Sequence, residues 1–146
     1  MEGILVVERS ATLGHLLKRT LGAASITPRG ELSSYLEALD HLQRSSELGQ
    51  NYRLVLIGAP ARMTREFAAL LDFFKGDGHA VPVLMMAHEK SPDLVQFAES
   101  RQPTNLIMWA EFSRIPGAIR ALAPASPVAA NEPKTDVAPT DRKSVV

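Results

Sequence analysis

Four short apolar runs recur along the chain, and each has the length of a β-strand. They cover residues 4–7, 54–57, 81–86 and 106–109. None of them alternates apolar with polar positions, which is typical of strands buried on both faces of a parallel sheet. The pattern therefore predicts four buried strands separated by longer segments.

The intervening segments carry apolar residues at the spacing of amphipathic helices. The five stripes are Leu13, Leu16, Leu17 and Leu21; Leu32, Leu36, Leu39 and Leu42; Phe67, Leu70, Leu71 and Phe74; Leu94, Val95 and Ala98; and Phe112, Ile115, Ile119 and Leu122. Ser10, Ser91 and Ser113 stand where N-caps are expected, and Gly49 and Gly76 stand at two expected helix ends. The pattern predicts five helices.

The order of these elements predicts the fold. Between the first two helices, residues 24–27 are assigned to a short, weak strand that ends before a proline. Strands that alternate with helices form parallel βαβ units with right-handed crossovers. We therefore predict an α/β protein with a doubly wound, five-stranded parallel sheet. Its (βα)5 topology gives a three-layer α/β/α sandwich over residues 1–123.

Residues 124–146 differ in composition from the rest of the chain. Proline recurs there among Ala, Thr, Asp and Lys, with only isolated valines. Such a segment cannot bury enough apolar surface to offset the entropy cost of ordering. We expect a disordered Ala/Pro-rich linker or tail. Because residues 142–146 resemble the approach to a new strand, we also expect a further domain to follow.

Composition and charge narrow the classes of function. The 146 residues are 45% hydrophobic and 22% charged, as expected for one globular domain. The 16 basic residues balance 16 acidic ones, so we expect no direct binding of nucleic acid. No cysteine is present, which excludes disulfides and thiol chemistry. Without an apolar run of about 18 residues or a signal peptide, we expect a cytoplasmic protein that does not enter a membrane.

The carboxyl ends of the predicted strands are the places to look for chemistry, because ligands of open parallel sheets bind there. Glu8 and Arg9 follow the first strand, and Gly58 follows the third. Ala87 follows the fourth strand, and Trp109 closes the fifth. These five positions form the candidate site.

Residues 4–10, 53–57 and 81–86 resemble the receiver (CheY-like) domains of two-component response regulators. The resemblance covers about residues 3–123 and implies a flavodoxin-like fold. In that family, an aspartate after the third strand accepts a phosphoryl group and an acidic pair helps to hold Mg²⁺. A Ser or Thr and a Lys bind the phosphoryl oxygens. This chemistry needs a carboxylate nucleophile, a hard cation and donors for the transferred charge.

The resemblance also implies that this chemistry is lost here. The phosphoacceptor position falls on Gly58 and the acidic pair on Glu8 and Arg9. The hydroxyl position falls on Ala87 and the lysine position on Trp109. The chain therefore resembles a degenerate pseudo-receiver that lacks the phosphoacceptor aspartate. We expect no enzymatic activity, no metal and no cofactor.

Two of these residues admit two interpretations each. Arg9 either forms an exposed pair with Glu8 or supplies in cis the positive charge of the missing cation. Trp109 either fills the former phosphate pocket or docks a partner as an aromatic anchor.

The first functional hypothesis is a regulatory module that binds a protein partner, a second copy of itself or its own downstream domain. By the resemblance, its interface lies on the fourth helix, fifth strand and fifth helix. The residues expected there are Phe97, Arg101, Trp109, Glu111 and Arg114.

The alternative hypothesis is a sensor of a small molecule or nucleotide. Its pocket would lie at the strand ends and be lined by Arg9, Gly58, His88 and Trp109. The indole would stack on the ligand, and the guanidinium would bind an anion.

Overall fold

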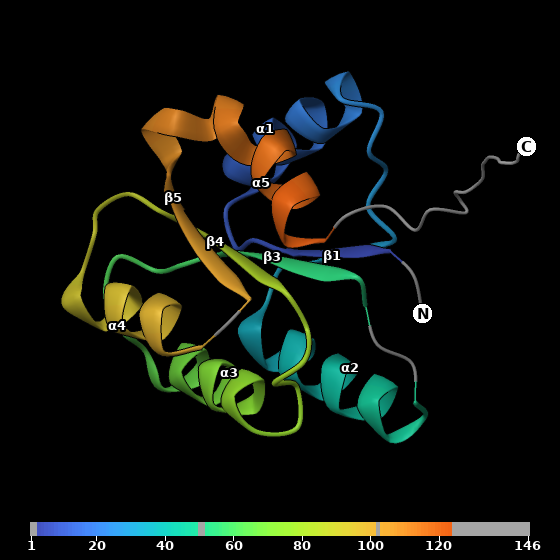
Figure 1. The fold of residues 1–146 in the computed structure, drawn as a ribbon, viewed down its shortest axis with the longest axis vertical. Helices are drawn as coiled ribbons and strands as arrows, with labels where there is room; N and C mark the ends of the chain where they lie inside the picture. The colour runs from blue at the N-terminus through green and yellow to red at the C-terminus, as the bar shows by residue number, and fades with distance from the viewer. Residues whose placement is uncertain (1–2, 50–51, 102, 124–146) are drawn as a thin grey trace, which may run out of the picture.

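The computed structural model describes residues 3–49, 52–101 and 103–123 (Figure 1). The linker or tail expected at 124–146 lies outside the described residues. None of the helices in the described ranges is long and apolar enough to cross a membrane.

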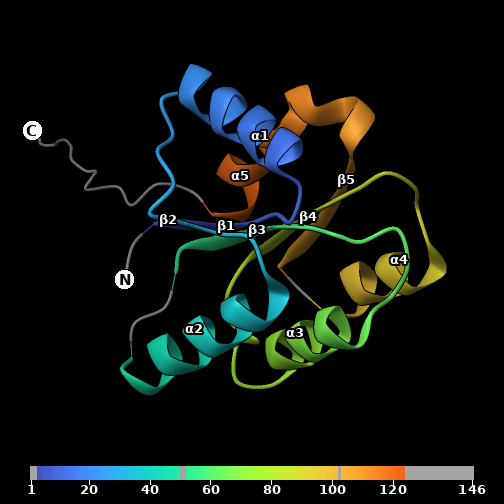
Figure 2. The same ribbon diagram turned by 180° about the vertical axis from the view of Figure 1, so that it is seen from behind.

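A five-stranded parallel sheet runs through the middle of the described part, in the order β2-β1-β3-β4-β5. Its strands are β1 (Ile4–Val7), β2 (Gly30–Leu32), β3 (Leu54–Gly58), β4 (Val83–Ala87) and β5 (Thr104–Met108). The helices are α1 (Ala11–Ala23), α2 (Tyr35–Glu47), α3 (Arg65–Lys75), α4 (Pro92–Ser100) and α5 (Ile115–Leu122), and a 3₁₀-helix, η1 (Trp109–Arg114), leads into α5. Figures 1 and 2 show α1 and α5 on one face of the sheet and α2, α3 and α4 on the other. The predicted doubly wound three-layer α/β fold is confirmed.

Side chains of the central strands alternate between two cores. In β1, Leu5 and Val7 belong to the α2–α3–α4 core. Ile4 and Val6 belong to the α1–α5 core on the opposite face. Strands β3 and β4 divide their side chains in the same way. Because helices cover both faces, these strands are apolar throughout, as the sequence pattern indicated.

Several predicted helix signals are present in the structure. The hydroxyl oxygens of Ser10 and Ser91 accept hydrogen bonds from the backbone N–H groups of Leu13 (3.3 Å) and Leu94 (3.2 Å), so both serines are N-caps. Gly49 adopts φ +71° after the end of α2, where glycine is favoured. The apolar stripe of α3 is buried along its whole length.

The second strand is not where the sequence pattern put it. It covers Gly30–Leu32 rather than residues 24–27, because α1 continues to Ala23 and the chain then turns through Ser25 at φ +61°. Strand β2 pairs only with β1 at the edge of the sheet, so one side chain, that of Glu31, faces solvent. An edge strand of this kind lacks the apolar run that marks the central strands.

The stripe predicted for the second helix is also wrong in part. Leu32 belongs to β2, and Leu36 is 56% exposed. Helix α2 begins after Ser34, whose hydroxyl accepts from the backbone N–H of Glu37. Its buried face is formed by Tyr35, Ala38, Leu42 and Ser45. The buried face therefore differs from the predicted leucine stripe, because Tyr35 and Ala38 belong to it and Leu36 does not.

Boundaries also differ at β4, at β5 and before α5. Strand β4 starts at Val83, because the N–H of Val81 bonds the carbonyl of Gly78 in a turn. Strand β5 ends at Met108, because η1 begins with Trp109. Ser113 is not an N-cap, since it lies inside η1 and α5 starts only at Ile115.

Candidate functional site

The carboxylate of Glu8 lies over Gly58 at the carboxyl ends of β1 and β3. A Cβ atom placed on Gly58 would stand 1.6 Å from Oε1 of Glu8 and 2.7 Å from its Cδ. No real side chain could share that space. Glu8 therefore occupies the position that a side chain on residue 58 would otherwise fill.

The N-terminal end of α1 holds Glu8 in this place. Oε2 of Glu8 accepts a hydrogen bond of 2.7 Å from the backbone N–H of Ser10. Partial burial raises the pKa of the Glu8 carboxyl above its usual value. The backbone N–H groups of Ser10 and Arg9 and the charges of His88 and Arg9 act in the opposite direction. The carboxylate is thus half-buried, with donors on one side and Gly58 below.

Tyr35, which the sequence analysis did not single out, completes this corner of the site. Its hydroxyl donates a buried hydrogen bond of 2.5 Å to the carbonyl oxygen of Gly58. The Arg9 guanidinium lies over the Tyr35 ring, 5.6 Å from its centroid. Burial, together with the charge of Glu8, raises the pKa of Tyr35 to about 12, so the phenol stays protonated. Tyr35 directly follows Ser34, the N-cap of α2, and nothing in the local sequence indicates its contact with Gly58.

Arg9 does not form the predicted ion pair with Glu8, whereas the interpretation that its charge replaces a missing cation stays a prediction. Arg9 is exposed, and no ion pair joins it to Glu8 among the described residues. Its guanidinium instead contacts the Tyr35 ring, which is attractive as a cation–π interaction.

Ala87, His88 and Trp109 lie at the ends of the neighbouring strands. Ala87 is buried and His88 is exposed. Trp109 is 7% exposed and belongs to the α1–α5 core, with its ring 6.3 Å from that of His88. Its Nε1–H has no hydrogen-bond partner in the described part of the chain. Trp109 is therefore a core residue, which contradicts the interpretation that it docks a partner as an aromatic anchor.

The residues present do not fit the magnesium site of receiver domains. Mg²⁺ needs oxygen ligands in near-octahedral arrangement. Gly58 offers no side chain, Arg9 brings a cation, and Glu8 is directed at Gly58 and Ser10. Within residues 3–49, 52–101 and 103–123, no group of three or more His, Cys, Asp or Glu is placed to hold a metal ion.

The pocket predicted for the sensor hypothesis is not formed. Arg9 lines a hollow between β1, α1 and β2, whereas His88 lines a different cavity between the β3–α3 and β4–α4 loops. In the described structure, Gly58 and Trp109 line neither of these two. Glu8 fills the space over Gly58, and Trp109 is turned into the core, so the four residues do not share a cavity.

The predicted partner-binding face is mostly interior. Phe97, Arg101 and Trp109 are 3%, 6% and 7% exposed, so the prediction that they contact a partner is wrong. Only Glu111 and Arg114 are exposed, and they pair with each other at 3.3 Å on η1. The resemblance located this face only by its elements, and it did not indicate which of their side chains point into the core.

Arg101 has a structural role at the opposite end of the sheet. Its guanidinium donates to the carbonyl oxygens of Phe74 and Gly78, each at 2.8 Å, and to Oγ1 of Thr104 at 2.9 Å. It also donates to the carbonyl oxygens of Val81 and Pro103. Burial lowers the pKa of Arg101 to about 10, so the side chain remains charged at neutral pH. It joins the end of α4 to the α3–β4 turn.

Comparison with known proteins agrees with this architecture. No protein-family model matches the sequence, and no curated protein matches it significantly. A two-component response regulator from Cytophaga hutchinsonii superposes with a TM-score of 0.67 at 12% identity, covering 83% of this chain and 95% of that one. The chemotaxis protein CheY4 of Vibrio cholerae gives 0.60 at 16% identity, covering 84% and 98%. The signal receiver domain of an HD domain-containing protein from Pseudomonas fluorescens Pf-5 gives 0.61 at 15% identity, covering 83% and 92%.

These similarities define the class of fold: the chain has the flavodoxin-like fold of CheY-like receiver domains. At 12–16% identity they establish the fold alone. Because one fold supports many activities, function has to be argued from the site.

Proposed function

We propose that this chain is a receiver-fold signalling module that works without aspartyl phosphorylation and acts by binding a protein. The observation that carries the proposal is the position of the Glu8 carboxylate over Gly58, 1.6 Å from where a Cβ would stand. The end of β3 carries no nucleophile, and the side chain of Glu8, directly after β1, fills the space where one would lie.

The surroundings of Gly58 support the same conclusion. Attack on a phosphoryl donor needs a free carboxylate, a cation and donors for the transferred charge. Here the carboxylate of Glu8 accepts a hydrogen bond from the N–H of Ser10. The hydroxyl and lysine positions hold buried Ala87 and buried Trp109, neither of which offers a side-chain cation or hydroxyl.

The partner is proposed to be a protein, either a separate effector or a domain that follows this one. The similar receiver domain from Pseudomonas fluorescens Pf-5 belongs to a larger, HD domain-containing protein, which supports this kind of arrangement. For the contact surface, or for self-association, we propose the exposed part of η1. Phe112, 39% exposed, lies there between Glu111 and Arg114.

Phosphoryl transfer is tested by incubating the protein with acetyl phosphate and Mg²⁺ and measuring its intact mass. A phosphorylatable receiver domain, treated in parallel, shows that the donor is active. We expect no mass increase of one phosphoryl group. Stoichiometric phosphorylation of Glu8 would overturn the proposal.

Protein binding through η1 is tested separately. We expect the double substitution Phe112→Ala and Arg114→Glu to abolish self-association, measured by sedimentation. Where the partner is a domain that follows this one, the same double variant should no longer bind that domain when it is supplied as a separate protein. Asp77→Asn, exposed on the α3–β4 turn, is the matched surface control. Binding that is equal in all these proteins would place the contact elsewhere.

A further inference from the structure

An open groove lies between α1 and η1, on the face of the sheet that α1 and α5 cover. Leu16 and Pro116 line this α1–η1 groove, and both are partly exposed. Phe112 lines it as well and is 39% exposed, although its side chain is large and apolar. The groove therefore offers a partner apolar surface that water now covers.

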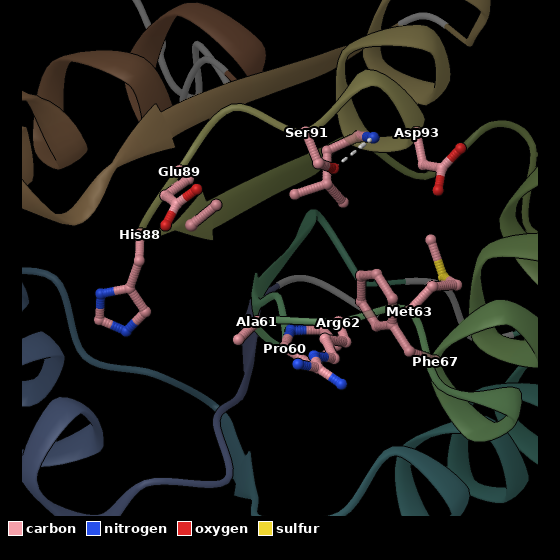
Figure 3. A pocket seen from close by; sticks show the side chains of 11 residues that line it. Pro60, Ala61, Arg62, Met63, Phe67, His88, Glu89, Ser91 and Asp93 are labelled. Carbon is pink, nitrogen blue, oxygen red and sulfur yellow. Dashed lines mark hydrogen bonds between the residues drawn. The ribbon is translucent and has the colours of Figure 1, made fainter.

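The cavity of about 350 Å³ between the β3–α3 and β4–α4 loops differs from this groove. Phe67 and Leu94 in its apolar wall are only 0% and 4% exposed. Figure 3 shows its charged side chains, Arg62 and Asp93 among them, well apart from each other. Because that wall offers little accessible surface and the charges do not converge, the α1–η1 groove is the better site for a partner.

The helices around the α1–η1 groove are basic. Together α1, η1 and α5 carry four basic residues and one acidic residue, Glu111. Arg19 lines the groove from α1, and Arg120 lies one helical turn after Pro116 on α5. Both arginines are exposed, and neither forms an ion pair or a side-chain hydrogen bond within the described ranges. Two available guanidinium groups therefore flank the exposed apolar surface.

The opposite face of the molecule carries the reverse charge. Figures 1 and 2 show α2, α3 and α4 across the sheet from α1 and α5. These three helices carry seven acidic and three basic residues. The formal net charge of zero for the whole chain thus results from two helical layers of opposite sign.

Helix α2 combines this negative charge with exposed apolar side chains. Leu36 and Leu48, near its two ends, are 56% and 72% exposed. An exposed stripe runs along the helix at steps of four, three and four residues, through Leu36, Asp40, Gln43 and Glu47. Leu48 lies off this stripe. The stripe has a large apolar side chain at one end and two carboxylates after it.

From these two surfaces we propose that the chain associates head to tail, with the stripe of α2 from one copy lying in the α1–η1 groove of the next. Leu36 packs against Phe112, and the carboxylates of the stripe pair with the two arginine side chains that flank the groove. This inference rests on the proposed function, because it names a second copy of the chain as the partner of the exposed part of η1.

The two surfaces lie on opposite faces, so one copy can use both at once. A contact between two different surfaces that does not close gives open chains of copies rather than pairs. Helix α2 has 13 residues and is about 20 Å long, which is short for an interface of standard size, roughly 1,200–2,000 Å². We therefore expect weak association, with a Kd of about 0.1–1 mM.

Sedimentation of the full chain at increasing concentration tests the association. We expect the weight-average sedimentation coefficient to rise over about 0.01–1 mM protein at low salt. It should fall again in about 0.5 M salt, because salt screens the charges on the two faces.

Two variants, each damaged on one surface, test the head-to-tail arrangement. The groove variant carries Arg19→Glu and Arg120→Glu, and the helix variant carries Leu36→Asp; all three positions are exposed. Each variant alone should be a monomer. Their equimolar mixture should form a complex of two chains and stop there, because the intact α2 of the groove variant fits the intact groove of the helix variant. The two damaged surfaces are both acidic and repel each other.

Matched controls show whether the effects belong to these surfaces. Leu48→Asp makes the same change on α2 but off the stripe, and it should associate as the wild-type protein does. Arg62→Glu with Arg65→Glu reverses two exposed arginines away from the groove and should also associate normally. Thermal unfolding followed by circular dichroism confirms that each variant is folded.

A wild-type protein that remains a monomer at about 1 mM overturns the inference. A mixture of the two variants that contains only single chains overturns it as well, and so does a groove variant that associates as strongly as the wild-type protein. None of these results contradicts the binding of another protein by the exposed part of η1, which the experiments on the proposed function test separately.

Discussion

The position of Glu8 over Gly58 makes a substitution at residue 58 depend on residue 8. In Gly58→Ala, the new Cβ would lie 1.6 Å from Oε1 of Glu8, so the carboxylate has to swing away. The backbone of Gly58 is not in the left-handed region that favours glycine. In the Glu8→Ala background, alanine at position 58 should therefore meet no obstacle, since the nearest atoms around its Cβ all belong to Glu8.

The magnitude follows from what the displaced carboxylate loses. Glu8 gives up the 2.7 Å hydrogen bond from the N–H of Ser10, and a bond to a charged group contributes about 1.5–3 kcal/mol. Replacing glycine by alanine returns about 0.4–1 kcal/mol by restricting the unfolded chain. Gly58→Ala should thus cost about 1 kcal/mol in the wild-type background and stabilise Glu8→Ala by about 0.5 kcal/mol. The coupling free energy between the two sites is then about 1.5 kcal/mol.

The assay is urea unfolding of the wild-type protein, the two single variants and the double variant. Gly22→Ala, in α1 with no heavy atom within 4 Å of the added Cβ, is the matched control for the general effect of replacing a glycine. The reasoning is refuted if Gly58→Ala changes the free energy of unfolding equally with and without Glu8. It would also fail if the control showed the same dependence on Glu8.

Three further predictions concern the same structure. Because burial raises the pKa of Glu8 in the folded state above 4.5, the folded protein holds that proton more tightly than the unfolded chain does. The stability of the wild-type protein therefore falls as the pH rises from about 4.5 through the folded-state pKa. Glu8→Gln should gain stability relative to wild type over that interval and keep a constant difference above it, measured as unfolding free energy against pH. Arg101→Lys should lose about 3 kcal/mol in urea unfolding, because lysine has three donors where arginine makes five hydrogen bonds; a loss below about 1 kcal/mol would contradict the proposed structural role. Tyr35→Phe should lower the unfolding free energy by about 1 kcal/mol by leaving the carbonyl of Gly58 unpaired, and unchanged stability would show that water replaces the phenol there.

The candidate site could be predicted from the sequence only as a set of positions. The residue types at strand ends already show that position 58 has no side chain and that Arg9 follows Glu8. The sequence does not show that Glu8 reaches across to β3, because that contact depends on the register of Ile57 beside Val7 and on the rotamer of Glu8. Tyr35 was missed for a similar reason, since its partner is a backbone carbonyl 23 residues away.

The cavity beside His88 was beyond sequence reasoning as well. Arg62 and Asp93 lie far apart in the chain, and nothing in their local sequence indicates that they line the same cavity. The burial of Phe97 in α4 and of Arg101 just after it could not be predicted either, because it depends on how α4 packs against β5.

The sequence by itself determined the α/β class, the parallel order of strands and helices, and the central strands. A strand buried on both faces has an unbroken apolar run, and a capping serine precedes the helix that it starts. Both signals therefore depend only on residues that are close together in the sequence. Only the tertiary structure decided the edge strand β2, the buried face of α2, the start of α5 and every contact in the site. An edge strand needs few apolar residues, and a side chain's partners come from other elements. These features depend on distances between segments that are remote in the chain, and no local pattern records such distances.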